Sequence, residues 1–386
     1  MKIGLFADTY LPATNGVAVH LQLLKKGLEK KGHEVHIFCP SYTGYIDREK
    51  NVHRFSTIAS TKVFEKALGI ELEGRISLPS YKKFSNIVHE LDILHTHHMF
   101  FAGRYAAHYS KKFRIPLVYT IHINYKEYEK ILPFKKINKK IIKSLLQQFT
   151  DRCEAVISPG EKMRTLLEEY GIKKPVHVIR NGIDLNQFGK SMPKLVSELK
   201  SKFNINENQK VLLYLGRICI SKNLQFLLKA LKPVLTETNT KLIIVGGGSF
   251  EPELKQLISK LKLKKSVIYT GRVPYKEVHS YYSLSDIFVT TSKSEVFPLT
   301  ILEALASSIP VVAIDAVGTG DIINNEIDGL LTRDNTKDYR NAVNRLLNND
   351  SERNRFAQNA RISVEKLSVE NCAKKHISLY NTYSKN

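Results

Sequence analysis

The sequence predicts an α/β protein with two doubly wound parallel sheets, one in each half of the 386-residue chain. Short apolar segments of strand length alternate with longer segments whose apolar residues recur at helical spacing. This alternation runs twice along the chain, with a polar, lysine-rich stretch at 186–208 between the two runs. Glycines and polar residues gather where the strands end, as they do in parallel sheets that bind ligands at their carboxyl edge.

We therefore expect two domains followed by a terminal segment. Residues 1–190 form the first domain and residues 191–365 form the second, in agreement with about 150 residues per domain. Residues 366–386 are expected to form a C-terminal helix, and we consider a return of this helix onto the first domain.

The first run opens with a buried-type strand at 2–7 and a turn-rich stretch at 8–16. An amphipathic helix at 17–31 follows, and Gly32 ends it. The next strand lies at 34–38, which completes the opening of a parallel sheet. Later elements of this run are expected as strands at 93–95, 116–121, 155–158 and 176–179, and as helices from 103 and at 161–170.

The loop before the first helix is a candidate phosphate site, although it lacks the G-x-G-x-x-G fingerprint of dinucleotide-binding proteins. Gly16 stands directly before the helix, after Asn15. A glycine there lets a backbone N–H approach a phosphate with no side chain in the way. An ordinary turn explains the same two residues equally well.

Several histidines follow the strand at 93–95, in the run His95-Thr96-His97-His98. Adjacent histidines on an extended chain point to opposite faces, so we expect no metal site in this run. His122 directly follows the strand at 116–121. It is therefore expected to point into the crevice at the carboxyl edge of the sheet.

The chain is strongly basic, with 59 Lys and Arg against 37 Asp and Glu and a net charge of +22. Such a charge indicates an anionic partner, namely nucleic acid, a membrane surface or a phosphorylated substrate. Solvated surface lysines without any partner are the alternative. The densest basic segment is 111–143, with ten basic residues and two acidic ones.

Residues 125–150 read as a basic helical stretch that Pro133 interrupts. Isoleucines and leucines recur there at helical spacing with lysines between them, as in helices that lie on anionic membranes. A core helix with a solvated lysine face is the alternative. No DNA-binding or RNA-binding signature is present, so we expect no nucleic-acid partner.

The cysteines and the apolar runs bear on localisation. Cys39, Cys153, Cys219 and Cys372 are widely spread with no C-x-x-C, which indicates a reducing interior and no cysteine metal site. No signal-like segment precedes the first strand, and no apolar run approaches the roughly 20 residues of a membrane span. We expect a cytoplasmic protein, peripheral on the inner face of the membrane.

The second run begins with a strand at 211–215 that ends in Gly216-Arg217. Lys222-Asn223 then opens a helix at 224–235. The next strand, 242–245, ends in three glycines. The remaining elements are expected as a helix at 251–261, strands at 267–270, 287–290 and 311–314, and polar helical segments over 336–386.

The stretch Ser292–Pro310, SKSEVFPLTILEALASSIP, is the centre of the second run. Its helix begins near Leu299, with Pro298 at a first-turn position where a missing N–H is tolerated. Glu295 lies just before the helix and Glu303 lies inside it. The helix N-terminus can hold a phosphate, and the two carboxylates can hold sugar and ribose hydroxyls. Alternatively, Glu295 only caps the helix and Glu303 is a solvated helix residue.

Arg217 and Lys222 add two positive charges at a strand end, as needed to neutralise a diphosphate. Together with Ser292–Pro310 and the other motifs given below, these residues make the chain resemble the retaining glycosyltransferases of family 4. Those enzymes have the GT-B fold of two Rossmann-like domains. The resemblance covers essentially the whole length. Its motifs are GLFADTYLPATNGVAVHL at the start, TIH at 120–122, RNGIDLNQF at 180–188, YLGRICISKN at 214–223, VGGGS at 245–249 and SEVFPLTILEALASSIPVV at 294–312.

The resemblance implies a role for each site residue. Gly16 offers its backbone to the diphosphate, and His122 lines the sugar site near the reacting carbon. Arg217 and Lys222 bind the diphosphate. The catalytic residues implied are His122, Arg217, Lys222 and Glu295. The other implied contacts are Glu295 with sugar hydroxyls, the backbone of Phe297, Pro298 and Leu299 with sugar and phosphate, Glu303 with the ribose, and Val273 with the base. Family members often have glycine in place of Pro298, so this chain lacks one N–H donor there.

The reaction implied is transfer of a hexose from a nucleotide sugar such as UDP-glucose, with retained configuration and without a metal or cofactor. The segment HINYKEY at 122–128 looks like the bacterial diacylglycerol glucosyltransferases, and the basic segment suits a lipid acceptor at a membrane. Transfer to a soluble or polyprenyl-linked glycan of the cell envelope is the alternative acceptor. A non-catalytic basic binding protein of the same shape is a further alternative.

Overall fold

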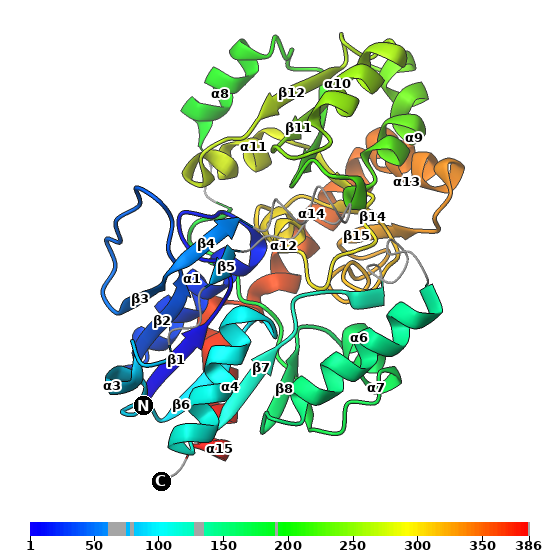
Figure 1. Ribbon diagram of the computed structural model, residues 1–386. Helices are drawn as coiled ribbons and strands as arrows, with labels where there is room; N and C mark the ends of the chain where they lie inside the picture. Colours follow the sequence, from blue (N-terminus) through cyan, green and yellow to red (C-terminus); the bar gives the residue numbers. More distant parts are fainter. Residues whose placement is uncertain (61–74, 78–80, 127–134, 190–191, 385–386) are drawn as a thin grey trace. The chain divides into compact units, whose positions relative to one another are not determined.

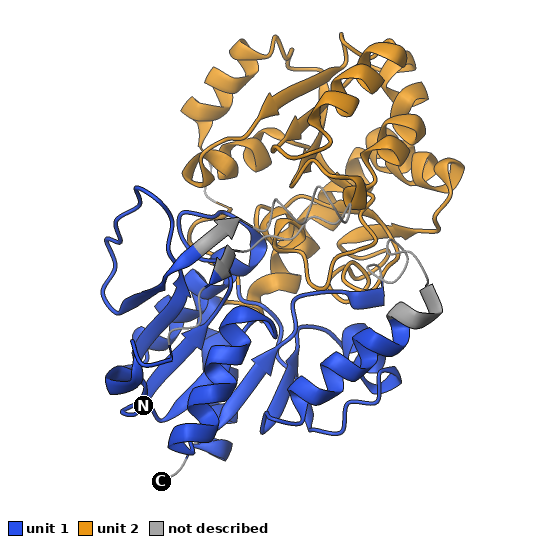
Figure 2. Ribbon diagram, in the orientation of Figure 1, with its two compact units in different colours: residues 1–182, 369–386 blue, residues 183–368 orange. Residues whose placement is uncertain are grey.

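The computed structural model describes residues 1–386 except 61–74, 78–80, 127–134, 190–191 and 385–386 (Figure 1). It divides into two compact units. Unit 1 comprises Met1–Gly182 together with Val369–Asn386, and unit 2 comprises Ile183–Ser368 (Figure 2). The division therefore falls after Gly182, whereas the sequence led us to expect it at residue 190.

Unit 1 is built on a parallel sheet of seven strands in the order β3-β2-β1-β6-β7-β8-β9. The order grows outward from β1 in both directions, which is the topology of a doubly wound sheet. The strands are β1 (Lys2–Phe6), β2 (Glu34–Pro40), β3 (Val52–Phe55), β6 (Ile93–Thr96), β7 (Leu117–Thr120), β8 (Ala155–Ser158) and β9 (Val176–Val178). A separate antiparallel pair joins β4 (Thr57–Ser60) to β5 (Arg75–Ser77).

The apolar runs that predicted these strands fill the core of unit 1. Four of the five residues of β1 are buried, because a parallel strand between two layers has no solvent face. The helices of the unit carry their apolar stripes toward this sheet. They are α1 (Gly16–Glu29), α3 (Ser85–Val88), α4 (Phe101–Phe113), α6 (Lys135–Thr150), α7 (Glu161–Glu169) and α15 (Val369–Tyr383).

The C-terminal helix α15 packs on α1, so the last segment of the chain completes unit 1. A Cβ added at Gly27 of α1 would lie 2.8 Å from Val369 Cγ1 and 2.9 Å from Ala373 Cβ. This close approach explains the glycine inside a helix, where it otherwise costs about 1 kcal/mol. Cys372 and Tyr380 join the same hydrophobic core as β1. The sequence led us to consider a return of this helix onto the first domain, and residues Val369–Asn386 do belong to unit 1.

Unit 2 repeats the plan with a parallel sheet of six strands in the order β12-β11-β10-β13-β14-β15. Here the order grows outward from β10 and β13. The strands are β10 (Lys210–Leu215), β11 (Thr240–Val245), β12 (Val267–Gly271), β13 (Ile287–Thr290), β14 (Val311–Ile314) and β15 (Gly329–Thr332). Its helices are α8 (Pro193–Lys202), α9 (Leu224–Glu237), α10 (Glu251–Lys260), α11 (Val278–Leu284), α12 (Leu299–Ala306), α13 (Thr336–Asn348) and α14 (Asp350–Glu365).

These two sheets confirm the predicted α/β class, and several short elements add to it. β3, β15 and α11 were not expected from the sequence. The four cysteines are all free and buried. Among the residues that the structure describes, no helix combines the length and the apolar character that crossing a bilayer requires.

Candidate active site

Each sheet has one point at which the strand order reverses, and ligands of open α/β sheets bind at the carboxyl ends of the strands beside that point. In unit 1 the point lies between β1 and β6, and in unit 2 it lies between β10 and β13. Several residues that the sequence marked as functional follow these strands: Gly16 follows β1, Arg217 and Lys222 follow β10, and Glu295 follows β13. His122 instead follows β7, the strand next to β6. The two edges are described separately below.

In unit 2, the loop after β10 carries Arg217 in a tightly packed turn. The Tyr214 hydroxyl donates to the Arg217 carbonyl oxygen over 2.8 Å. The neighbouring strand brings Gly246 so close that a Cβ there would lie 1.8 Å from the Gly216 carbonyl oxygen. Only glycine fits this contact, and Gly246 also has a φ of +138°. The glycines after β10 and β11 thus hold the two loops together.

Lys222 and Glu295 form an ion pair that joins the β10 loop to the loop after β13. Lys222 ends a short 3-10 turn, Ile220–Lys222, and is 7% exposed. The Thr291 hydroxyl donates to the carbonyl oxygens of Lys222 and Asn223 over 3.3 and 3.0 Å. The ammonium group is therefore held at the carboxyl edge of the sheet, beside the carboxylate of Glu295.

The electrostatics of Glu295 are those of a carboxylate that stays ionised. Burial acts to raise its pKa, but Lys222 above all, then Arg217 and Ser292, outweigh this and lower the pKa below its ordinary value. Its backbone is also fixed. A Cβ at Gly318 would lie 2.7 Å from the Glu295 carbonyl oxygen, so the loop after β14 packs directly on it.

The residues after Glu295 are buried as they enter α12. Phe297 is 6% and Leu299 is 7% exposed. Pro298 is the residue before the helix, with φ of −69° and ψ of 116°, and the helix begins at Leu299. The expected first-turn position of Pro298 is thus wrong by one residue, because its ψ is extended and not helical. α12 itself confirms the predicted helix.

Glu303 lies inside α12 as expected, but it is not a solvated residue. It is 3% exposed, and its two carboxylate oxygens accept hydrogen bonds from Tyr275 at 3.0 Å and Tyr282 at 2.8 Å. Burial raises the pKa of Glu303 to about 7, although both tyrosines act to lower it. Nothing in the sequence indicated these two tyrosines, because β13 lies between them and α12 and they meet Glu303 only in the folded unit. Val273, two residues before Tyr275, is partly exposed after β12.

In unit 1, the loop after β1 presents Gly16 at the start of α1. The Asn15 side chain accepts from the Ala18 N–H over 2.9 Å, as a helix N-cap, and donates to the Thr9 hydroxyl over 2.9 Å. Within the described part of the chain, a Cβ added at Gly16 would meet no atom within 4 Å. The packing of unit 1 therefore does not require glycine at this position.

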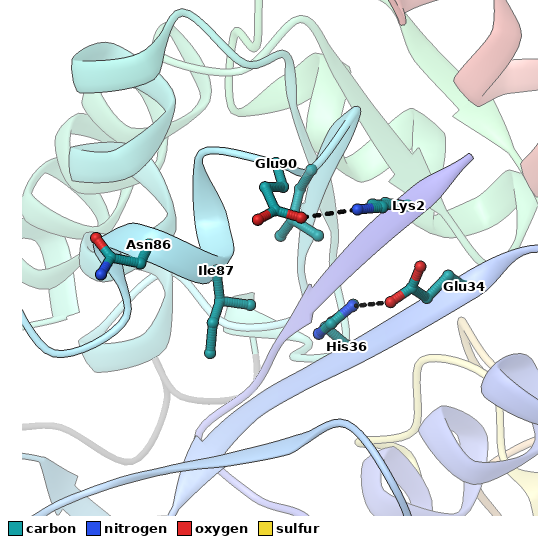
Figure 3. Close-up of a pocket in the computed structure, with 7 residues that line it drawn as sticks. Lys2, Glu34, His36, Asn86, Ile87 and Glu90 are labelled. Atoms are coloured by element: carbon teal, nitrogen blue, oxygen red, sulfur yellow. Dashed lines mark hydrogen bonds and ion pairs between the residues drawn. The ribbon is translucent and has the colours of Figure 1, made fainter.

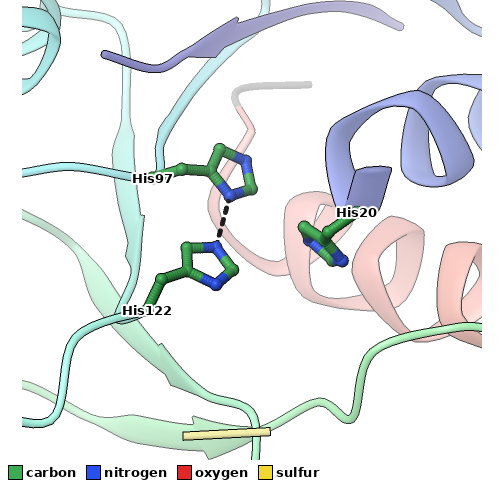
Figure 4. A group of neighbouring side chains, drawn as sticks. All are labelled: His20, His97 and His122. Atoms are coloured by element: carbon green, nitrogen blue, oxygen red, sulfur yellow. Dashed lines mark hydrogen bonds between the residues drawn. The ribbon is translucent and has the colours of Figure 1, made fainter. Parts of the chain in front are cut away.

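His122 meets two other histidines at the edge of the unit 1 sheet (Figure 4). His97 Nδ1 and His122 Nε2 are 2.9 Å apart and hydrogen-bonded. The ring of His20, from α1, lies 5.4 Å from that of His97 and 5.2 Å from that of His122. His20 was not singled out from the sequence, although a histidine within the apolar stripe of a helix was a usable signal.

The rings of this group are neutral. Burial, above all, lowers the pKa values of His20, His97 and His122, and neighbouring histidines lower them further. For His20 the pKa falls to about 3. The Nε2 atoms of His20 and His97 are buried and have no hydrogen-bond partner among the residues that the structure describes.

The same three histidines have the composition of a metal site, since each offers a nitrogen within 4.8 Å of the others. The sequence argument considered only the run 95–98 and did not foresee a group drawn from three segments. Adjacent histidines of the run do point in different directions: His97 bonds to His122, whereas His98 accepts from the Asp8 N–H over 3.1 Å. However, Nδ1 of His97 and Nε2 of His122 already bond to each other.

A surface pocket lies at the opposite end of the unit 1 strands (Figure 3). Lys2 and Glu34, the first residues of β1 and β2, line it. Lys2 Nζ lies 2.7 Å from Glu90 Oε2, and His36 Nε2 lies 2.9 Å from Glu34 Oε1. The charges of this pocket are thus paired among themselves, at the edge where parallel sheets do not place their ligand sites.

Comparison with known proteins agrees with this geometry. Residues 14–187 match the model of "Glycosyltransferase Family 4", and residues 196–363 match that of "Glycosyl transferases group 1". Alpha-monoglucosyldiacylglycerol synthase of Streptococcus pneumoniae is 34% identical over 337 residues, which are 86% of this chain and 75% of that protein. The enzyme of the same name from Acholeplasma laidlawii is 31% identical, over 81% of this chain and 80% of its own.

Solved structures share the fold along the full chain. Sucrose-phosphate synthase of Thermosynechococcus elongatus superposes with a TM-score of 0.81 at 19% identity, covering 99% of this chain and 98% of that one. Anabaena HepE in complex with UDP-glucose gives 0.79 at 21% identity, covering 99% and 100%. The fold is therefore GT-B, and the chain is a glycosyltransferase that belongs to family 4.

Proposed function

We propose that this enzyme transfers glucose from UDP-glucose to a membrane lipid such as diacylglycerol, with retention at the anomeric carbon and without a metal ion. The observation that carries the proposal is the charged group at the unit 2 edge, where Arg217, Lys222 and Glu295 lie together beside the point of strand reversal. The acceptor is suggested by the two relatives named as glucosyldiacylglycerol synthases.

The diphosphate of the donor is assigned to the cationic side of this group. The guanidinium of Arg217 can form paired hydrogen bonds to phosphate oxygens, while the ammonium of Lys222 acts as a point charge. The backbone from Phe297 to Leu299, at the N-terminus of α12, adds N–H groups that favour an anion. Pro298 contributes no N–H to this set.

The uridine and glucose parts are assigned to the two glutamates. Glu303 accepts from the ribose hydroxyls, with Val273 beside the base. Glu295, kept ionised by Lys222, accepts from glucose hydroxyls. Gly16 in unit 1 gives its backbone to the diphosphate, and the absence of any packing need for glycine there supports this role. His122 contacts the sugar near the reacting carbon.

The chemical step is a substitution on one face of the sugar. The bond from C1 to the diphosphate oxygen breaks, and its electron pair stays on that oxygen. The acceptor hydroxyl forms the new bond to C1 on the same face and passes its proton to the leaving phosphate oxygen. Arg217 and Lys222 stabilise the negative charge that develops on the leaving group, which is where preorganised charges accelerate a reaction most.

A lipid acceptor requires the protein to reach a membrane surface, and α6 in unit 1 has a suitable face. Leu146 and Phe149 of α6 are buried against the core. Ile141 and Leu145, on another face, are 50% and 40% exposed, and Lys139 and Lys140 beside them are exposed. One face of the helix is therefore part of the core. The other face combines apolar and basic side chains, which supports the proposal that it lies on an anionic membrane. Residues 127–134 of the basic segment 111–143 lie outside the described residues.

The test is a transfer assay with UDP-glucose and mixed liposomes that contain diacylglycerol, in the presence of EDTA. We expect glucosyldiacylglycerol with an α-linkage, identified by the anomeric proton coupling in the NMR spectrum. A β-linked product would contradict retention, and a strict need for added magnesium or manganese would contradict the metal-independent mechanism. Parallel reactions with a soluble glycan and a polyprenyl-linked glycan identify the acceptor if the lipid fails.

A further inference from the structure

We propose that Tyr380 and His97 are positioning residues: through contacts inside unit 1, they fix the ring of His122. This inference rests on the proposed function, in which His122 contacts the sugar. It adds two residues that lie outside the sugar site, one of them at the far end of the chain.

The first link is the hydrogen bond between His97 Nδ1 and His122 Nε2, at 2.9 Å. The two rings are stacked, with centroids 5.2 Å apart and planes inclined by 20°. The bond occupies Nε2 of His122, so Nδ1 is the nitrogen that remains for a sugar hydroxyl. His97 therefore sets both the direction of the ring and the nitrogen that His122 presents.

The second link holds His97 in place through His95. The ring centroids of these two histidines are only 4.2 Å apart, because residues two apart on a strand face the same side. His95 is itself bonded at both ends. Its Nε2 lies 2.7 Å from the Thr120 hydroxyl, at the end of the strand that leads to His122. His95 cannot rotate without breaking this bond.

The third link comes from the C-terminal helix. The Tyr380 hydroxyl lies 2.7 Å from His95 Nδ1, and Tyr380 is fully buried. Its helix, α15, is held on α1 by the close contacts of Val369 and Ala373 with Gly27. The chain thus leaves unit 1, builds all of unit 2 and returns to unit 1 to supply this hydroxyl.

A metal ion is the competing explanation of the histidine group. If it bound the two nitrogens that face each other, it would break the bond between His97 and His122, because an imidazole nitrogen that binds a metal cannot also bond to its neighbour. A dication would also be buried among rings whose strongest electrostatic neighbours are other histidines, with no acidic group among them. Uncompensated buried charge is costly. The neutral hydrogen-bonded series fits the site better.

The experiment compares variants of the full-length enzyme in glucose transfer and in UDP binding. His97→Ala should lower kcat by about 10-fold to 100-fold, the range for a misplaced active-site group, with little change in KM for UDP-glucose. His97→Asn keeps a polar atom near Nδ1 and should recover most of this loss. Tyr380→Phe should lower kcat by a smaller factor in the same direction. His376→Gln is the matched control, since His376 is equally buried beside the group but bonds to the Cys372 carbonyl oxygen.

Two further measurements decide whether His97 acts through His122. In the His122→Ala background, His97→Ala should cause no additional loss of kcat, because the ring that it positions is gone. In histidine-labelled protein, the nitrogen NMR signals of His122 should show one tautomer in wild type and a mixture in His97→Ala. This spectrum needs no activity, so it tests positioning even if the donor or acceptor differs from the proposal.

Three results would overturn the inference: additive losses for His97→Ala and His122→Ala, an unchanged His122 spectrum in His97→Ala, or one tightly bound zinc per chain in the purified protein. Failure of the proposed function is seen separately, as wild-type protein that does not bind UDP.

Discussion

The two units share one topology but place opposite kinds of chemistry at the edge where the strand order reverses. In unit 2 this edge is charged, with the Lys222–Glu295 ion pair and Arg217 nearby. In unit 1 it is filled by neutral imidazoles, since burial lowers the pKa of each histidine in the group. Fixed cations suit a diphosphate, whereas neutral polar rings suit hydroxyl groups that carry no charge. The comparison indicates that the topology provides the position and the side chains decide the ligand.

The histidines themselves are divided unevenly. Twelve of the thirteen belong to unit 1, and His279 is the only one in unit 2. Each unit buries a carboxyl group whose pKa is raised to about 7, Asp8 in unit 1 and Glu303 in unit 2. In unit 1, however, the buried histidines with lowered pKa values outnumber this carboxyl group. The stability of the two units should therefore change in opposite directions with pH. Mutations in the two units should affect different steps of the reaction.

The largest effect is expected at the charged edge. Glu295→Gln should lower kcat by about 100-fold to 1,000-fold, because it removes an ionised contact that strengthens in the transition state. UDP should still bind, since Arg217 and Lys222 remain. The check is steady-state transfer together with UDP titration, with thermal unfolding as the control for folding. Turnover close to that of wild type would show that this edge does not hold the sugar.

The next effect concerns Glu303 and the pH dependence of donor binding. Ribose hydroxyls donate to a carboxylate, so binding requires the group to lose its proton when the pH is below its pKa of about 7. The Kd for UDP-glucose, whose diphosphate does not titrate in this range, should rise toward about tenfold per pH unit below pH 7. Glu303→Gln should bind more weakly at pH 8 and show a flat profile. A sloping profile in that variant would assign the titration elsewhere.

Acid should destabilise unit 1 in particular. The folded unit holds buried neutral histidines, and the pKa falls to about 3 for His20 and to about 4 for His98 and His376. The unfolded chain binds these protons near pH 6.5, so the free energy of unfolding falls as the pH drops below that value. One unit lower, each such histidine costs about 1.4 kcal/mol. Asp8, whose pKa is raised to about 7, opposes this with a single group.

In unit 2 the sign is reversed for Glu303. Its raised pKa gives stability that is fully present below the unfolded value near 4.5 and is lost as the pH rises through about 7. Glu295, whose pKa is lowered, acts in the other direction. Hydrogen exchange read by peptide at pH 7 and pH 5.5 separates the units. Protection should fall further in β1 and β6 than in β10 and β13, and an equal loss in both would contradict the assignment of the neutral cluster.

The smallest expected effect per residue is at the membrane, where each lysine near an anionic surface contributes about 1 kcal/mol. Replacing Lys135, Lys136, Lys139, Lys140 and Lys143 of α6 with glutamine should release the protein from anionic liposomes. Ile141→Ser with Leu145→Ser should weaken binding without changing its salt dependence. The matched control replaces five exposed lysines of unit 2, which are Lys229, Lys232, Lys260, Lys264 and Lys265. Equal release by the control would mean that general charge is responsible, and a wild type that ignores anionic liposomes would favour a soluble acceptor.

The sequence was sufficient for the regular elements and for side chains that follow them directly. β8, β13 and β14 have the predicted bounds, because three or four consecutive apolar residues between turn signals form a buried strand. β15 was missed, since GLLT lies in a polar stretch and becomes a strand only by pairing with β14. Glu295 and Glu303 were likewise predicted from local sequence, since one lies just before and the other lies within the predicted helix, α12.

What the sequence did not show are the partners that arrive from elsewhere in the chain. Tyr282 reaches Glu303 from α11, and Tyr380 reaches His95 from a helix that follows all of unit 2. No local pattern marks such pairs, because the contact exists only after the units fold. The neutral state of the histidines has the same origin, since it depends on burial by other segments.

The central claim is that the charged side chains of unit 2, and not the neutral histidines of unit 1, determine the affinity for the nucleotide diphosphate. UDP titration calorimetry of wild type, Arg217→Met and His122→Asn tests it directly. We expect Arg217→Met to weaken UDP binding by about 10-fold to 100-fold, the effect of losing charge-assisted hydrogen bonds. His122→Asn should bind UDP as wild type does while losing transfer activity. The account is contradicted if Arg217→Met keeps wild-type affinity for UDP, or if His122→Asn loses as much affinity as Arg217→Met.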